Sequence, residues 1–379
     1  MNLNRLEEKL PDNELLLEKK KTKKKEQVIP KAGNDASGKL HELLTGYHVN
    51  GGRHMQKFMD KDGESPEEAH ERIRKTLHPK EYDRHVERAR QAADDLRKGG
   101  HIKGKIIGVR WTSKPGDTER ATGIAASQKE DASDIVITTK HKGKVRHHGV
   151  SLKASEEKTH HVGTSNFGLE VTYGGREHYE RHQAQIRAAH PILATLGNKK
   201  ARKEWMKHPK NAKHAAKIRE ANLKVLHKIA HHTGEQINKR GTKGIQAHIR
   251  DHILKTNMTP MEKHGHVHIR HTSYVGKDGA RQHHTVVPSS HWEPLLRDHK
   301  NLKAEVKGTT IHFSHKGKVF ATHRMKFESQ NDPLGTIKGF GNSHGDYSPT
   351  PIDSRKAMVK RVSRGVTSRR RKKARKARK

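Results

Sequence analysis

The chain of 379 residues contains no cysteine and is poor in aromatic residues, which make up 4% of it. The lack of cysteine excludes disulfide bonds and thiolate metal sites, and it fits an environment that is reducing or indifferent to cysteine. Hydrophobic residues account for only 30% of the chain. That share is low for a globular protein, so we expect part of the chain to stay outside any packed core.

Long apolar runs are also missing. No continuous apolar segment follows Met1, so we expect no secretory signal peptide. Nothing in the sequence has the length and apolarity of a membrane-anchoring helix, or an amphipathic face rich in aromatic residues. We therefore expect no membrane partner.

Acidic residues are greatly outnumbered by basic ones. The chain has 42 Asp and Glu against 80 Lys and Arg, a formal net charge of +38 with neutral histidines. A compact protein gains nothing from this surplus, because like charges repel one another and destabilise the folded state. A polyanionic partner explains it, and nucleic acid is the commonest such partner.

The two ends of the chain are the most basic segments. We expect residues 1–34 to form an N-terminal arm and residues 346–379 a disordered tail, since residues 355–379 hold fourteen Lys or Arg and no acid. A tail that serves solubility or localisation is the alternative. The tail residues expected to bind nucleic acid are Arg369, Arg370, Arg371, Lys372, Lys373, Arg375 and Lys376.

Residues 35–345 are expected to fold as one domain with a charged helical insert at about 65–98. Apolar spacing predicts an amphipathic helix over 37–49, with Ser37 as its N-cap and Asn50-Gly51-Gly52 as its end. Further helices are predicted over 65–98 and 177–254, and strands over 105–112, 134–139, 145–154, 264–274, 310–314 and 319–327. This order predicts an α+β fold, or an α/β fold, with a mixed sheet flanked by helices.

One predicted hairpin carries residues suited to catalysis. If its turn centres near Lys142, Asp134 lies opposite position 150 or 151, at a cross-strand distance of about 5 Å. Ser151 and Lys153 then share one strand face, because side chains alternate along a strand. A carboxylate can hold Mg²⁺, which activates bound water, and a lysine can stabilise the negative charge that develops on a phosphate.

The same hairpin resembles the core of the PD-(D/E)XK nuclease superfamily, which has the restriction-endonuclease-like fold. Ser133-Asp134-Ile135-Val136-Ile137 followed by Gly149-Val150-Ser151-Leu152-Lys153 is most similar to nucleases carried by tailed phages. Residues 38–55 resemble the first helix of that family, and Ser165-Asn166-Phe167-Gly168 resembles a later N-x-G element. The resemblance covers roughly residues 37–175, with a weaker echo near residues 324–341.

The resemblance implies a role for each matching residue. Asp134 matches the metal-binding aspartate, Lys153 the catalytic lysine, and Glu42 the acid of the first helix. The implied cofactor is Mg²⁺ or Mn²⁺, held by Asp134 and Glu42. Ser151 stands where the family pattern has Asp or Glu, and a serine is a weak metal ligand. Either two carboxylates suffice, or Glu156 or Glu170 moves in, or the fold has lost activity.

Other candidates have simpler explanations. His264, His266 and His268 alternate on a predicted strand and could bind a transition metal, but the same pattern describes an ordinary half-buried strand with a polar face. The three tryptophans are too sparse for a base-stacking platform. No phosphate-binding glycine loop, dinucleotide fingerprint or zinc finger is present.

Three functions remain open. The first is a metal-dependent, phage-type DNA nuclease that hydrolyses phosphodiester bonds, active in the host cytoplasm during infection or associated with the virion. The second is a non-catalytic DNA-binding or packaging protein that keeps a degenerate nuclease fold. The third is an RNA-binding basic protein, which the composition allows but the hairpin pattern does not indicate. The oligomeric state is not predictable from the sequence.

Overall fold

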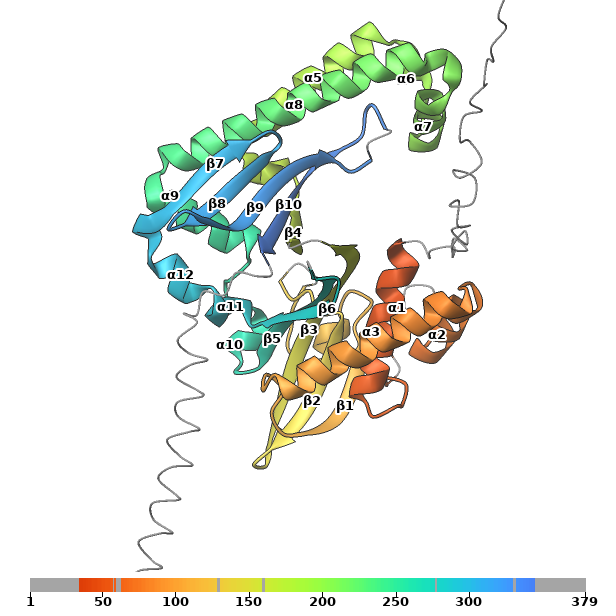
Figure 1. Ribbon diagram of the computed structural model, residues 1–379, viewed down its shortest axis with the longest axis vertical. Coiled ribbons are helices and arrows are strands. Elements are labelled where there is room, and N and C mark those ends of the chain that lie inside the picture. Colours follow the sequence, from red (N-terminus) through yellow and green to blue (C-terminus); the bar gives the residue numbers. More distant parts are fainter. Residues whose placement is uncertain are drawn as a thin grey trace, which may run out of the picture.

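The computed structural model describes residues 34–56, 58, 63–127, 130–158, 161–276, 278–329 and 332–344. These residues form a mixed fold of helices and two five-stranded sheets, one in each of two lobes (Figure 1). The predicted α+β class is therefore confirmed. Both expected basic ends lie outside the described residues, except for Asn34, which begins the first helix.

The first sheet has the strand order β1-β2-β3-β5-β6. Its strands are β1 (Lys105–Trp111), β2 (Ile135–His141), β3 (Lys144–Lys158), β5 (Val267–Val275) and β6 (Arg281–Val286). β1, β2 and β3 form an antiparallel meander, β5 runs parallel to β3, and β6 is antiparallel to β5. The sheet is therefore mixed, as the sequence predicts.

The turn between β2 and β3 lies where the sequence places it. Lys142 and Gly143 both have positive φ, 48° and 78°, which is the backbone of a type I′ hairpin turn. The register that follows pairs Ile135 with Val150. The same Lys-Gly chemistry recurs at Lys316 and Gly317, which join β8 to β9.

A layer of three helices lies on one face of the first sheet: the first and third contact its strands, and the second packs against the first (Figure 1). They are α1 (Asn34–Val49), α2 (Pro66–Lys75) and α3 (Pro79–Lys98). Their apolar side chains share one core with the sheet, and its fully buried members include Leu40, Leu96, Trp111 and Ile135. The helices over 65–98, expected as an insert, thus contribute directly to this core.

The second sheet is antiparallel throughout, with the order β4-β10-β9-β8-β7. Its strands are β4 (His161–Phe167), β7 (Leu302–Lys307), β8 (Thr310–His315), β9 (Lys318–Phe327) and β10 (Ile337–His344). The long helix α8 (Ala212–Lys239) packs against β7, β8 and β9, with α5 (Gly175–Ala189) beside it. Figure 1 shows both helices along the upper lobe.

Short elements connect these layers. The helices are α4 (Asp117–Thr122), α6 (Ile192–Thr195), α7 (Lys199–Lys207), α9 (Gly241–His248), α10 (Pro260–Lys263), α11 (Pro288–His291) and α12 (Glu293–Arg297). Short 3-10 helices are η1 (Leu169–Thr172), η2 (Pro209–Asn211) and η4 (His299–Asn301), and η3 (Ile249–Ile253) is a single π-helical turn. The helical region predicted over 177–254 is interrupted at Pro191, Gly197 and Pro209.

Two local predictions at α1 have different outcomes. Asn50-Gly51-Gly52 ends α1 as expected, since both glycines adopt positive φ. Ser37 is not the N-cap, because α1 already begins at Asn34. Within the described residues no helix is long and apolar enough to cross a membrane.

Candidate active site

Asp134 lies immediately before β2, and its backbone and side chain are both held by hydrogen bonds. Its N–H donates to Val150 O at 2.9 Å, and its carbonyl accepts from Thr112 N at 3.0 Å. The carboxylate oxygen Oδ2 accepts from the N–H of Leu152 at 2.6 Å. The carboxylate is therefore fixed against β3 before any ligand arrives.

Lys153 reaches the same carboxylate from β3. Its Nζ lies 3.5 Å from Asp134 Oδ2, and its side chain is half exposed. The register that pairs Ile135 with Val150 carries Asp134 to the position opposite Ser151, one of the two positions expected from the sequence. The hairpin thus brings together an anchored carboxylate and an ammonium group that solvent and a ligand can reach.

Glu42 approaches from α1. The indole Nε1 of Trp111 donates to Glu42 Oε2 at 3.0 Å, which fixes the carboxylate over the end of β1. Burial, together with the negative charge of Asp134, raises the pKa of Glu42 to about 8, although the hydrogen bond from Trp111 and the nearby cations Lys153 and Lys39 act in the opposite direction. Two carboxylates therefore crowd one small region beside Lys153.

This donor set fits a hard divalent cation. Mg²⁺ prefers oxygen ligands and is commonly held in proteins by one or two carboxylates together with water and phosphate. The repulsion between Glu42 and Asp134 is the electrostatic condition that such a cation relieves. Among the residues that the structure describes, no cluster of three or more His, Asp or Glu side chains is placed to bind a metal.

Ser151 does not supply a third carboxylate, and none moves in to replace it. Ser151 is buried and pairs with Arg270 across the parallel β3–β5 ladder. Glu156 forms ion pairs with Arg88 and Arg281 instead. Glu170 is exposed, and its Oε1 accepts from the N–H of Gly168 at 2.9 Å.

The glycine of the hairpin motif has a steric reason. A Cβ at Gly149 would collide with the hydroxyl of Ser133 and press on Met261. Ser133 in turn donates to the buried carboxylate of Asp131. The motif therefore keeps β3 close to the segment that leads into Asp134.

A cleft of about 640 Å³ opens beside Lys153, between the two sheets. Its first wall is the sheet face that carries Ser151, Lys153, His268 and Arg270, opposite to the face under α1. The residues that complete it come from β4, from η3 with the segment that follows it, and from the segment before Asp134: Gly163, Thr164, Ser165, Asn166, Asp251, Lys255, Asn257, Met258, Thr259, Pro260, Lys263, Glu130 and Ala132. Asn166 of the predicted N-x-G element, with Ser165 before it, thus lines this cleft.

The histidines expected on one strand do not share a site. β5 begins only at Val267, so His264 caps the end of α10 and His266 precedes the strand. His266 Nδ1 accepts from the backbone N–H of His147 at 3.2 Å. His268 Nδ1 lies 3.4 Å from Asp131 Oδ1 in a buried pair. The alternation in the sequence therefore does not produce a three-imidazole face.

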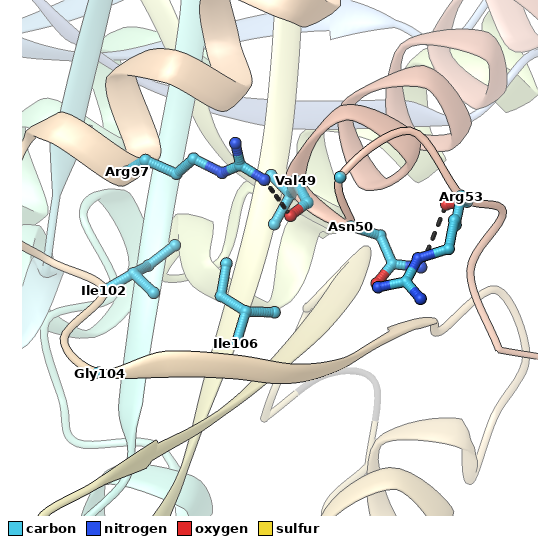
Figure 2. Close-up of a pocket in the computed structure, with 8 residues that line it drawn as sticks. Val49, Asn50, Arg53, Arg97, Ile102, Gly104 and Ile106 are labelled. Atoms are coloured by element: carbon cyan, nitrogen blue, oxygen red, sulfur yellow. Dashed lines mark hydrogen bonds between the residues drawn. The ribbon is translucent and has the colours of Figure 1, made fainter.

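A second cavity, of about 410 Å³, lies at the C-terminal end of α1 (Figure 2). Arg97 Nη2 donates to the carbonyls of His48 at 3.0 Å and Val49 at 2.6 Å. Asn50 Nδ2 donates to Arg53 O at 3.1 Å. These contacts satisfy the free carbonyls of a helix end and the turn after it, so the cavity has a structural explanation.

The comparisons with known proteins leave the site to be interpreted from its own geometry. No protein-family model matches the chain, and no match is found among curated proteins or solved structures.

Arg270 and Lys255 are two charged cleft residues that the sequence did not single out. Arg270 lies in a histidine-rich strand whose parallel pairing partner is remote in sequence. Lys255 directly follows the helical region predicted over 177–254, and nothing in the sequence indicates its positive φ of 49°. The tail residues expected to bind nucleic acid, 369–373 and 375–376, lie outside the described residues.

Proposed function

We propose that the protein is a metal-dependent DNA nuclease that hydrolyses phosphodiester bonds at Glu42, Asp134 and Lys153. The observation that carries the proposal is that three side chains lie close together. They are the carboxylate of Glu42 on α1, the carboxylate of Asp134 just before β2, and the ammonium group of Lys153 on β3. The basic composition supports a nucleic-acid substrate. The resemblance of the hairpin to PD-(D/E)XK nucleases supports the reaction type.

The chain's own residues would divide the work. Asp134 and Glu42 would hold the cation, one anchored by Leu152 N–H and the other by Trp111. When bound, a divalent metal supplies charge neutralisation at the phosphate and a bound water of lowered pKa. Lys153, half exposed beside Asp134, would stabilise the negative charge on the phosphate oxygens.

A second function, DNA binding without cleavage, is favoured by one observation. Ser151 holds the position of a family carboxylate, and its strand neighbour is the cation Arg270. This arrangement lowers the negative charge available to a metal and favours a phosphate group instead. A packaging or virion-associated role would suit such a protein.

Plasmid nicking tests the catalytic proposal. Supercoiled DNA is incubated with the full chain and Mg²⁺, Mn²⁺ or EDTA, and the Asp134→Ala and Lys153→Ala variants are compared. We expect nicking only with metal, and a loss of about 100-fold or more in each variant, because each removes a group that acts on the reacting phosphate.

Matched controls are Asp83→Asn on α3 and Lys140→Ala at the other end of the hairpin, both exposed. These should nick at the rate of the unaltered protein. Nicking that survives EDTA, or that persists in both site variants, would show that the site is wrong. Binding without nicking in every metal would favour the second function.

A further inference from the structure

Arg270 is a buried cation with little to neutralise it. Its side chain is 7% exposed and lines the cleft from the middle of β5. Its side chain donates two long hydrogen bonds to a single carbonyl, Leu254 O, from Nη1 at 3.4 Å and from Nη2 at 3.5 Å. A guanidinium carries five N–H donors, so most of its hydrogen-bonding capacity is left for another group.

No carboxylate compensates this charge among the described residues. The two acids at the cleft are engaged elsewhere: Glu130 Oε2 accepts from Ser127 N at 3.1 Å and Oγ at 2.7 Å. Asp251 Oδ1 accepts from Asn257 Nδ2 at 2.9 Å. Burial lowers the pKa of Arg270 to about 10, which still leaves the group protonated near neutral pH. An uncompensated buried charge is costly, so its presence calls for an anionic ligand.

Further cations surround the same space. Lys153, Lys255 and Lys263 line the cleft with Arg270. Burial lowers the pKa of Lys255, and the charge of Arg270 lowers it further, so the two cations lie close enough to repel each other. Lys255 is also held at a φ of 49°, a conformation that costs free energy in a non-glycine residue and that is often found at ligand sites.

We propose that Arg270, Lys255 and Ser151 form a binding site for a backbone phosphodiester of nucleic acid, in the cleft between the two sheets. The guanidinium offers paired N–H donors that match phosphate oxygens, and Ser151 adds a hydroxyl on the neighbouring strand. Lys153 also lines this cleft, and its Nζ lies 3.5 Å from Asp134 Oδ2, so a strand bound there would pass close to Asp134. The choice of nucleic acid as the source of the phosphate rests on the proposed function; the anion site itself does not.

The test measures binding with cleavage switched off. A fluorescent single-stranded oligonucleotide is titrated in EDTA at moderate salt with the full chain, Arg270→Met, and the control Arg219→Met, which removes an exposed arginine of α8. We expect about a ten- to hundredfold loss of affinity for Arg270→Met and less than a twofold loss for the control. Inorganic phosphate should compete with the oligonucleotide on the unaltered protein but not on Arg270→Met.

A stability readout separates an anion site from a structural role. Without ligand, Arg270→Met should unfold at the same temperature as the unaltered protein or higher, because an unpaired buried charge is replaced by an apolar side chain. Lys255→Asn, which tolerates the left-handed backbone and leaves the core intact, should also weaken oligonucleotide binding.

Several outcomes would overturn the proposal. If Arg270→Met and Arg219→Met bind the oligonucleotide with equal affinity, the proposed site is wrong. If Arg270→Met fails to fold, an unaltered oligonucleotide affinity in Lys255→Asn has the same meaning. Inorganic phosphate that binds without competing against the oligonucleotide would mean that the site serves a free anion. Loss of nicking in Asp134→Ala with binding retained concerns catalysis alone, so the two proposals fail separately.

Discussion

Individual residues of the candidate site differ in how readily a sequence reveals them. Asp134 and Lys153 could be found because one hairpin links them, and its turn fixes the register. Glu42 required the family resemblance, since nothing in a helical pattern says which sheet edge its side chain meets. Arg270 could not be found, because its burial follows from a parallel pairing with β3.

Ser151→Asp tests the electrostatics of the cleft at a single position. We expect the new carboxylate to pair with Arg270 and to raise the free energy of unfolding by about 1–3 kcal/mol, because it neutralises a buried cation. The measurement is urea unfolding at neutral pH, with Ser151→Asn as the uncharged control of the same shape.

The same substitution should weaken competition by inorganic phosphate, since the internal carboxylate occupies the guanidinium. If Ser151→Asp were no more stable than Ser151→Asn, Arg270 would already be compensated.

At the scale of elements, strands with a clear apolar pattern were predictable and those without one were not. β2 and β3 were expected, whereas β4, β6, β7 and β10 were missed. β10 (IKGFGNSH) shows why: its glycines allow neighbours to approach closely, and a Cβ at Gly339 would collide with the ring of Phe167 on β4. β10 therefore forms because it pairs with β4 on one side and β9 on the other, and its own sequence lacks the pattern that would predict a strand.

The turn between β2 and β3 allows a prediction for this element. Gly143→Ala should destabilise the protein by about 1–2 kcal/mol, because an alanine at a φ of 78° brings Cβ too near the backbone. Lys142→Asn should be neutral or stabilising, since asparagine adopts this conformation readily. Chemical denaturation measures both.

Plasmid nicking per folded molecule should stay unchanged in both turn variants, because the turn lies at the far end of the hairpin from Asp134. A loss of nicking in Lys142→Asn would mean that the turn itself contacts substrate.

At the scale of the whole molecule, buried histidines make stability depend on pH. Burial lowers the pKa of His248 to about 3 and that of His148 to about 4, and both side chains are almost fully buried. Their pKa in the unfolded chain is about 6.5. The stability that these two neutral imidazoles contribute is therefore fully present above pH 6.5. It is lost as the pH falls towards 4, because the unfolded state takes up protons first.

Each such imidazole should contribute a slope of about 1.4 kcal/mol per pH unit in that window. Urea unfolding at pH 7.5, 6 and 5 measures it. His248→Gln should reduce the slope by the contribution of one imidazole, about 1.4 kcal/mol per pH unit. His78→Gln, at an exposed position, should leave the slope unchanged. A free energy of unfolding independent of pH would contradict the burial of these groups.

The basic tail gives a prediction about the whole chain's affinity. Deleting residues 355–379 removes fourteen cations. DNA binding should weaken and its dependence on salt concentration should flatten, because fewer counterions are released from the phosphates. Fluorescence anisotropy across a salt series tests this, and an unchanged slope would mean that the tail does not contact phosphate.

The chain crosses between the two sheets three times: from β3 to β4, from η3 to β5, and from β6 to β7. The central pairing of the first sheet, His148 with Val267, therefore closes a loop of about 120 residues. Closing so long a loop costs conformational entropy before the contacts repay it. We expect the α1–β3 segment to collapse early and β5 to dock late, after the helices and β4 have folded. The cleft and its arginine would then be completed last, and refolding should show a slow phase in which the anion site appears only at the end.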